Sequence, residues 1–159
     1  MRVELRLPAQ AAGGEAARAV VVDTNIVLDL LVFADPAVAP LRDLLAQGRL
    51  QWVATQAMRD ELERVLAYPK IVPRLAFHGL NAAVVLAAFD ARTRQVPEAS
   101  RVASVCKDAD DQKFIDLAVA HRAILLSKDK AVICMRKRLL AQQAHVATLL
   151  VLEPAERAA

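Results

Sequence analysis

Short apolar runs alternate with longer amphipathic stretches along most of the chain. Four runs rich in Val, Leu or Ala and a weaker run, RQV, at 94–96 predict five strands; the four apolar runs lie at 19–22, 50–54, 123–126 and 148–152. Between and beside them, apolar residues recur at helical spacing at 26–33, 37–47, 56–67, 80–92, 111–121 and 130–143. Strands that alternate with helices are joined by right-handed crossovers onto a parallel sheet, so the pattern predicts an α/β fold, a three-layer α/β/α sandwich.

The two ends of the chain depart from this alternation. Residues 1–18 are rich in alanine, contain the Gly13–Gly14 pair and show no clear strand or helix period, so we expect a flexible N-terminal extension. Residues 155–159 are expected to form a short C-terminal tail. The remaining length suits one hydrophobic core, and we predict a single domain over 19–154.

Composition narrows the class of protein. Hydrophobic residues make up 56% and charged residues 25% of the chain, as is typical of a folded domain. The four glycines form neither a dinucleotide-binding nor a P-loop motif. Cys106 and Cys134 lie far apart without a CxxC motif, which argues against a zinc site or a disulfide. No apolar run reaches the roughly 18 residues of a membrane span, so we expect a cytoplasmic protein with no membrane segment.

Two acidic residues lie just after the ends of predicted strands. Asp23 ends the run VVVD, and Asp129 follows AILLSK. In an open parallel sheet, ligands bind beyond the carboxyl ends of the strands, so acids at these positions are candidates for a functional site. Asn25 is positioned to cap a helix that begins at Ile26, which is an ordinary structural role.

Two more acids lie on helices and face inward by helical phase. Glu61 falls at the border of the apolar stripe of 56–67, and Asp111 falls inside the apolar face of 111–121, whereas Asp116 falls outside it. The structural alternative for Glu61 is a salt bridge to Arg59 or Arg64. For acids at a helix start, such as Asp108 and Asp111, the alternative is capping, because the helix dipole favours them there.

Four carboxylates at one edge of a sheet would repel one another unless some stay protonated or a cation binds between them. A site made of oxygen ligands suits Mg²⁺ or Mn²⁺, and hydrolysis of a phosphodiester is a reaction that such a site supports. The three histidines, His78, His121 and His145, are scattered along the chain, which argues against a ribonuclease based on histidine.

Four stretches, taken in order, resemble the motifs of one known family. They are VVVDTNIVLDLL (20–31), MRDELERVLAYPK (58–70), CKDADDQKFIDLAVAHRA (106–123) and LLSKDKAV (125–132). Together they resemble the PIN domain family of small metal-dependent ribonucleases, and within it the VapC-like toxin components of type II toxin–antitoxin systems. The resemblance runs from about Val20 to Pro154.

The resemblance implies a parallel five-stranded sheet in the order 3-2-1-4-5, counted along the chain. It also implies that four acids bind Mg²⁺ or Mn²⁺ and act in catalysis, namely Asp23, Glu61, Asp111 and Asp129. Asn25 and Ser127 match positions that orient the site, and Asp108 matches a supporting acid. Three lysines flank the site and are candidates for contact with RNA phosphates: Lys113, Lys128 and Lys130.

The family further implies an RNA substrate, a cognate antitoxin and a homodimer. The net charge of +3 suits a polyanionic partner without requiring one. The N-terminal extension is longer than the family needs, and a start codon assigned too far upstream would account for it.

Two other functions are compatible with parts of the pattern. A haloacid dehalogenase-type phosphatase also has an Asp after its first strand and uses Mg²⁺, but it needs a second Asp at the position of Asn25. A PIN scaffold that binds a partner without catalysis is the other alternative, and the presence of all four acids argues against it. We therefore expect a metal-dependent endoribonuclease, with cleavage of RNA as the property that separates it from the scaffold.

Overall fold

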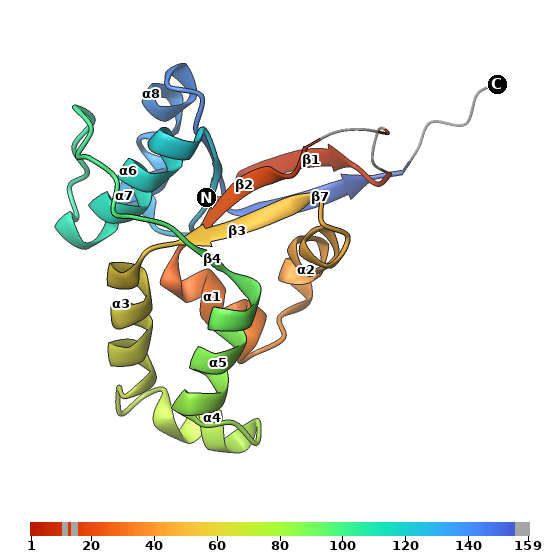
Figure 1. The fold of residues 1–159 in the computed structure, drawn as a ribbon, viewed down its shortest axis with the longest axis vertical. Helices are drawn as coiled ribbons and strands as arrows, with labels where there is room; N and C mark the ends of the chain where they lie inside the picture. Colours follow the sequence, from red (N-terminus) through yellow and green to blue (C-terminus); the bar gives the residue numbers. More distant parts are fainter. Residues whose placement is uncertain (11–12, 14–15, 155–159) are drawn as a thin grey trace.

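The structure, a computed structural model, describes residues 1–10, 13 and 16–154. The C-terminal tail expected at 155–159 and part of the expected N-terminal extension lie outside these residues. A five-stranded sheet forms the centre of the molecule (Figure 1). Its strands are β2 (Arg18–Val22), β3 (Leu50–Ala54), β4 (Arg94–Gln95), β5 (Ile124–Leu126) and β6 (His145–Ala147). They lie in the order β4-β3-β2-β5-β6, and every neighbouring pair is parallel.

This architecture confirms the predicted α/β class with a parallel five-stranded sheet. The first four predicted strands take the expected relative order. Counted along the chain, β2, β3, β4 and β5 are the first to fourth predicted strands, and they lie side by side in the order 3-2-1-4. The prediction is wrong for the fifth position. The edge strand is β6, whereas the more apolar run at 148–152 forms β7 (Leu149–Glu153) in a separate sheet.

The second sheet joins the two ends of the described chain. β7 pairs in parallel with β1 (Glu4–Pro8), within the stretch for which the sequence predicted no regular element. The backbone N–H of Val3 donates to Thr148 Oγ1 at 2.9 Å, and the backbone N–H of Thr148 donates to the Val3 carbonyl at 2.8 Å. Thr148 therefore separates β6 from β7 and directs the chain toward β1.

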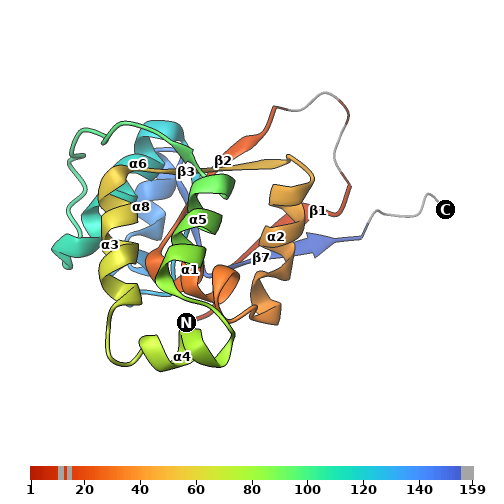
Figure 2. The same cartoon turned by 60° about the horizontal axis from the view of Figure 1, so that its bottom comes forward.

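Helices cover both faces of the central sheet. The first face carries α1 (Thr24–Leu31), α2 (Ala39–Ala46), α3 (Gln56–Leu66), α4 (Val72–Phe77) and α5 (Ala82–Arg92), with the short η1 (Pro36–Val38) before α2. The other carries α6 (Gln112–His121), α7 (Lys130–Ile133) and α8 (Arg136–Ala141), with η2 (Ala109–Asp111) before α6. Figure 2 shows α3 and α5 side by side, with α4 at their far ends.

Two details of the helices differ from the sequence pattern. The six-residue α4 lies between two predicted helices and was not predicted, because six residues are too few to establish a period. The helix predicted at 130–143 is divided into α7 and α8. In the part of the chain that the structure describes, no single helix is long and apolar enough to cross a membrane. Only when α1 and the segment Pro36–Ala46 are taken together do they reach that length and apolar composition, and they are bent by 101° relative to each other.

The central strands are buried on both faces, and this burial fixes where they end. Val20 and Val21 on β2 and Ile124 and Leu125 on β5 have no exposed surface, as expected for a parallel sheet between two helix layers. β2 and β5 are neighbours in register, and the Asp23 N–H donates to the Leu126 carbonyl at 2.9 Å. The residues that follow these two strands are therefore held close together on a rigid base.

Candidate metal centre

Asp23 and Ser127 meet where β2 and β5 end. Asp23 is 5% exposed, and its Oδ2 accepts a hydrogen bond of 2.7 Å from the Ser127 hydroxyl, which is fully buried. Burial raises the pKa of Asp23, the Ser127 hydrogen bond opposes that rise, and the charges of Glu61 and Asp129 add to it. Asp23 is thus a buried acid close to two other carboxylates and fixed by a hydroxyl from the neighbouring strand end.

Three carboxylates form the tightest group of acids. Oxygens of Asp108, Asp111 and Asp129 lie within 4.8 Å of one another. Asp108 precedes η2, Asp111 ends it, and Asp129 precedes α7. The sequence placed Asp108 in a supporting role, whereas the structure puts its carboxylate in the same group as Asp111 and Asp129. We call Asp108, Asp111 and Asp129 the three-acid group.

Helix caps orient two members of the three-acid group. The Asp110 N–H donates to Asp108 Oδ1 at 3.0 Å, and the Ala131 N–H donates to Asp129 Oδ1 at 2.9 Å. The capping alternative that the sequence suggested for Asp108 and Asp111 therefore occurs at Asp108, whereas the Asp111 side chain makes no cap bond and Asp129 caps α7 without having been predicted to. Capping holds one oxygen of the Asp108 and Asp129 carboxylates to the backbone and thereby fixes the direction of each carboxylate group.

Asp111 has the most perturbed environment of the three. It is 7% exposed, and its Oδ2 has no hydrogen-bond partner among the described residues. Its pKa is raised from 3.8 to about 8, first by burial, then by a hydrogen bond that only its protonated form can donate to Asp129, and then by the charges of Asp23, Asp129 and Asp108. A buried carboxylate without a partner is costly, and a bound cation would remove this cost.

The donor set fits a hard divalent cation. The ligand atoms of the three-acid group are all carboxylate oxygens, and neither the nearby Cys106 nor a histidine among the described residues is a member of it. Oxygen ligands of this kind are those that Mg²⁺ and Mn²⁺ prefer, and Asp111 offers a buried oxygen without a partner among the described residues, close to other acids whose charges raise its pKa. The residues present are therefore suited to hold such an ion.

Glu61 lies beside this group and has partners of its own. It accepts hydrogen bonds from the Thr24 hydroxyl and from Lys113 Nζ, the latter at 2.9 Å. The predicted alternative, a salt bridge to Arg59 or Arg64, is wrong for Arg59, which pairs with Asp90 at 2.8 Å and contacts Glu63 at 3.7 Å. Among the described residues, the only ion pair of Glu61 is with Lys113.

The three lysines expected near RNA take different positions. Lys113 pairs with Glu61 and also donates to the Asp110 carbonyl at 2.6 Å. Lys128 pairs with Asp29 at 2.5 Å, and Lys130 is exposed at the start of α7. Two of the three are therefore engaged by acids of the protein, and their contact with phosphate stays a prediction.

Two expectations about individual side chains are corrected by the structure. α1 begins at Thr24 with Asp23 at the cap position, so Asn25 lies exposed in the first turn and does not cap the helix. Asp116, expected to face solvent, is 8% exposed. It accepts from Gln112 Nε2 at 2.9 Å and from the Val102 N–H at 3.1 Å, because the segment before η2 folds over this side of α6.

Sequence reasoning did not identify the supporting network on α6 and α1. Gln112 also accepts from the Cys106 N–H at 2.7 Å and donates to the Ser104 carbonyl at 3.0 Å, which ties the segment before the three-acid group to α6. The spacing of Gln112 and Asp116, four residues apart on one helix, was the available signal. The Thr24 contact with Glu61 carried no comparable signal, because it joins residues 37 positions apart.

Comparison with known proteins places this geometry in a family. The model of the PIN domain family matches residues 19–131, which cover both strand ends and all the acids described above. The chain therefore belongs to the PIN domain family. An uncharacterized protein of Methanocaldococcus jannaschii is 26% identical over 117 residues, which cover 74% of each chain.

A similar fold is found among solved structures. The structure of VapBC2 from Rickettsia felis bound to a DNA fragment from its promoter matches with a TM-score of 0.54 and 15% identity. The match covers 87% of this chain and 99% of that chain. At this identity the likeness concerns the fold, which agrees with the parallel sheet and its helix layers.

Proposed function

We propose that this PIN domain is an endoribonuclease that hydrolyses RNA phosphodiester bonds with Mg²⁺ or Mn²⁺. The observation that carries the proposal is the three-acid group, in which the buried Asp111 oxygen lacks a partner within the described residues. PIN domains are generally nucleases, and this group lies where ligands of parallel sheets bind. Family membership also favours this function over the phosphatase alternative.

The proposal gives each residue a specific part. Asp108, Asp111 and Asp129 would hold the cation. Asp23 and Glu61 would add two further carboxylates beside it. A bound divalent cation supplies a Lewis acid and offsets the charge that accumulates on phosphate oxygens during hydrolysis. Ser127 keeps Asp23 in position through its hydroxyl, and Lys113 keeps Glu61 in position through its ammonium group.

The biological role that we propose is that of a toxin restrained by a cognate antitoxin in the cytoplasm, acting as a homodimer. The likeness to VapBC2 and the motifs of the sequence support this role. An antitoxin encoded next to this protein should co-purify with it and suppress RNA cleavage when both are expressed together. If no neighbouring frame encodes such a protein and expression of the wild-type chain leaves growth unaffected, the toxin role is wrong even if the nuclease proposal holds.

The enzymatic proposal is tested with purified protein and a pool of single-stranded RNA of diverse sequence. Fragments should accumulate with Mn²⁺ or Mg²⁺ and should not form in EDTA. The scaffold alternative makes the opposite prediction: the protein would bind Mn²⁺, as measured by calorimetry, and leave the whole pool uncut.

A further inference from the structure

The outer edge of β3 is only partly covered by β4. Val53 and Ala54 pair with β4, whereas Leu50, Gln51 and Trp52 have a strand partner only on the β2 side within the described residues. A strand edge without a neighbour offers backbone N–H and C=O groups to another extended chain. Recognition by strand addition uses such an edge for affinity and the adjacent pockets for specificity.

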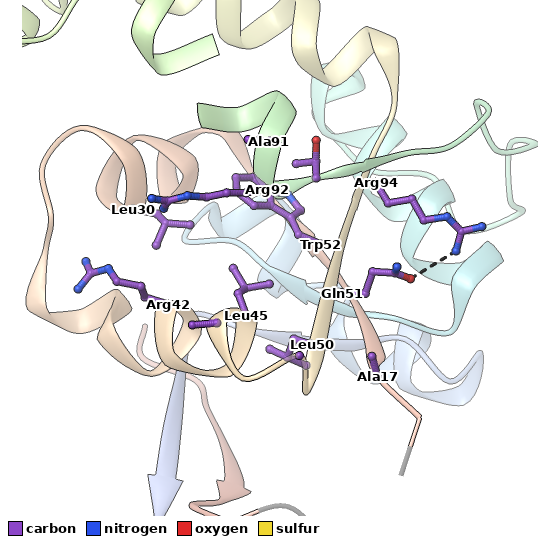
Figure 3. Close-up of a pocket in the computed structure, with 13 residues that line it drawn as sticks. Ala17, Leu30, Arg42, Leu45, Leu50, Gln51, Trp52, Ala91, Arg92 and Arg94 are labelled. Atoms are coloured by element: carbon purple, nitrogen blue, oxygen red, sulfur yellow. Dashed lines mark hydrogen bonds between the residues drawn. The ribbon is translucent and has the colours of Figure 1, made fainter. Parts of the chain in front are cut away.

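A cavity of about 620 Å³ opens along this uncovered edge, between α2 and the end of α5 (Figure 3). Its lining includes the aliphatic side chains of Leu30 and Leu45 together with Leu50. The volume lies within the range of about 300–1,000 Å³ typical of ligand sites. None of the residues that line it belongs to the three-acid group, so this is a separate site.

Arginines surround the cavity on two sides. Arg42 and Arg92 lie on one side of the β3 ribbon, and Arg94 lies on the other with Gln51 (Figure 3). Arg94 donates to Gln51 Oε1 at 3.4 Å, while Arg42 and Arg92 form no ion pair with any residue that the structure describes. No acid is among the lining residues that the structure describes. The cavity therefore combines an aliphatic interior with three arginines that form no ion pair with any described residue.

We infer that this cavity is a docking site for an extended segment of a partner protein that carries alternating aliphatic and acidic side chains. The segment would pair with the uncovered edge of β3, place aliphatic side chains against Leu30 and Leu45, and pair its carboxylates with the arginines. Side chains of an extended chain alternate between two faces, which matches cations on both sides of β3.

Two other occupants fit the site less well. Single-stranded RNA is bound by phosphate contacts together with bases stacked on exposed aromatic rings, and the aromatic residue of this lining, Trp52, is only 1% exposed. A second copy of the chain in a symmetric contact would bring the arginines of both copies together. An acidic segment of a different protein satisfies both the charge and the aliphatic lining.

The test uses a fluorescein-labelled peptide of eight residues in which Glu and Val alternate, with a second peptide carrying Lys for Glu. Fluorescence anisotropy should show saturable, salt-sensitive binding of the Glu peptide and none of the Lys peptide. The double variant Arg92→Gln/Arg94→Gln should weaken binding by about tenfold, because it removes a cation on each side of β3. The matched control Arg101→Gln/Arg138→Gln removes two exposed arginines elsewhere and should bind as the wild type does.

Strand pairing is tested separately with two N-methylated versions of the Glu peptide, methylated on alternate residues of opposite phase. One version keeps the N–H groups that face β3 and should bind like the parent, while the other should lose binding. The inference is overturned if the Glu peptide does not bind, if the Lys peptide binds equally, or if both methylated versions bind like the parent. Displacement of the Glu peptide by an oligouridylate at lower concentration than by unlabelled peptide would assign the site to nucleic acid instead.

Discussion

Asp111 is the single residue that most strongly supports the proposed cation site. It is buried in the three-acid group, its Oδ2 lacks a partner within the described residues, and its pKa is raised to about 8 by burial and by its acidic neighbours. Helix phase predicted that Asp111 faces inward. Phase could not predict that Asp108 joins it, because the turn of η2 that brings them together depends on capping rather than on a hydrophobic period.

The raised pKa of Asp111 makes stability depend on pH when no metal is present. The folded state binds this proton more tightly than the unfolded chain, in which the pKa is near 3.8. The stabilisation that this proton gives to the folded state is therefore complete below pH 3.8 and is lost as pH rises through about 8. In EDTA, the free energy of unfolding should fall by about 1 kcal/mol more per pH unit in this window for the wild type than for Asp111→Asn.

Urea unfolding of both proteins at pH 5, 6 and 7 measures this difference. Parallel pH profiles for wild type and variant would show that Asp111 does not carry the raised pKa. The variant folds without taking up this proton, so it should be the more stable protein at pH 7 in EDTA.

Ser127 provides a second test at the scale of a residue, because it acts through Asp23. Ser127→Ala removes the 2.7 Å hydrogen bond that fixes Asp23 and lets the carboxylate rotate. The Mn²⁺ concentration that gives half-maximal RNA cleavage should rise about tenfold. Ser100→Ala changes an exposed serine and should leave that concentration unchanged. An unchanged Mn²⁺ requirement in Ser127→Ala would show that Asp23 does not depend on this hydroxyl.

At the scale of elements, the sequence predicted the buried strands and long helices well and the ends of the chain poorly. Continuous apolar runs such as β2 and β5 are a strong signal, because both faces of those strands are covered. The edge strand β6 has only three residues, and the more apolar run that follows it, which was predicted to be the edge strand, forms β7 in the second sheet. β1 does show alternation, with Leu5 and Leu7 partly buried between exposed neighbours, but five residues beside an alanine-rich segment gave a weak pattern.

Thr148 is the position that tests whether the second sheet docks as described. Its hydroxyl accepts from the Val3 N–H and also donates to the Val3 carbonyl at 3.0 Å. Thr148→Val keeps the shape of the side chain and removes both hydrogen bonds, so the free energy of unfolding should fall by about 1–2 kcal/mol. Chemical denaturation measures this loss, and hydrogen exchange should rise in β1. Unchanged stability together with unchanged exchange in β1 would contradict the pairing of β1 with β7.

At the scale of the whole molecule, charge is distributed unevenly around the sheet. Acids gather beyond the carboxyl ends of β2 and β5, where two of the nearby lysines are already paired with Glu61 and Asp29. The chain as a whole nevertheless carries a net charge of +3. A polyanion such as RNA would be repelled by the unliganded acidic edge, which is a physical reason for the proposed activity to depend on a divalent cation.

The pattern of the sequence could locate this edge because strand ends select Asp23 and Asp129, and helix phase adds Glu61 and Asp111. It could not assign the partners that hold them, since Thr24, Ser127 and Lys113 reach their acids across 37 to 104 positions of sequence. The partly covered edge of β3 was equally hidden, because it results from β4 being only two residues long.

The measurement that tests the central claim most directly compares RNA cleavage by two variants from one turn of the chain. Asp111→Asn changes the buried member of the three-acid group, and Asp110→Asn changes its exposed neighbour, which lies outside that group. With Mn²⁺ and the diverse RNA pool, Asp111→Asn should reduce the cleavage rate by at least about a hundredfold, and Asp110→Asn should stay close to wild type. Equal rates for wild type and Asp111→Asn, with both proteins folded, would show that the three-acid group is not the nuclease centre.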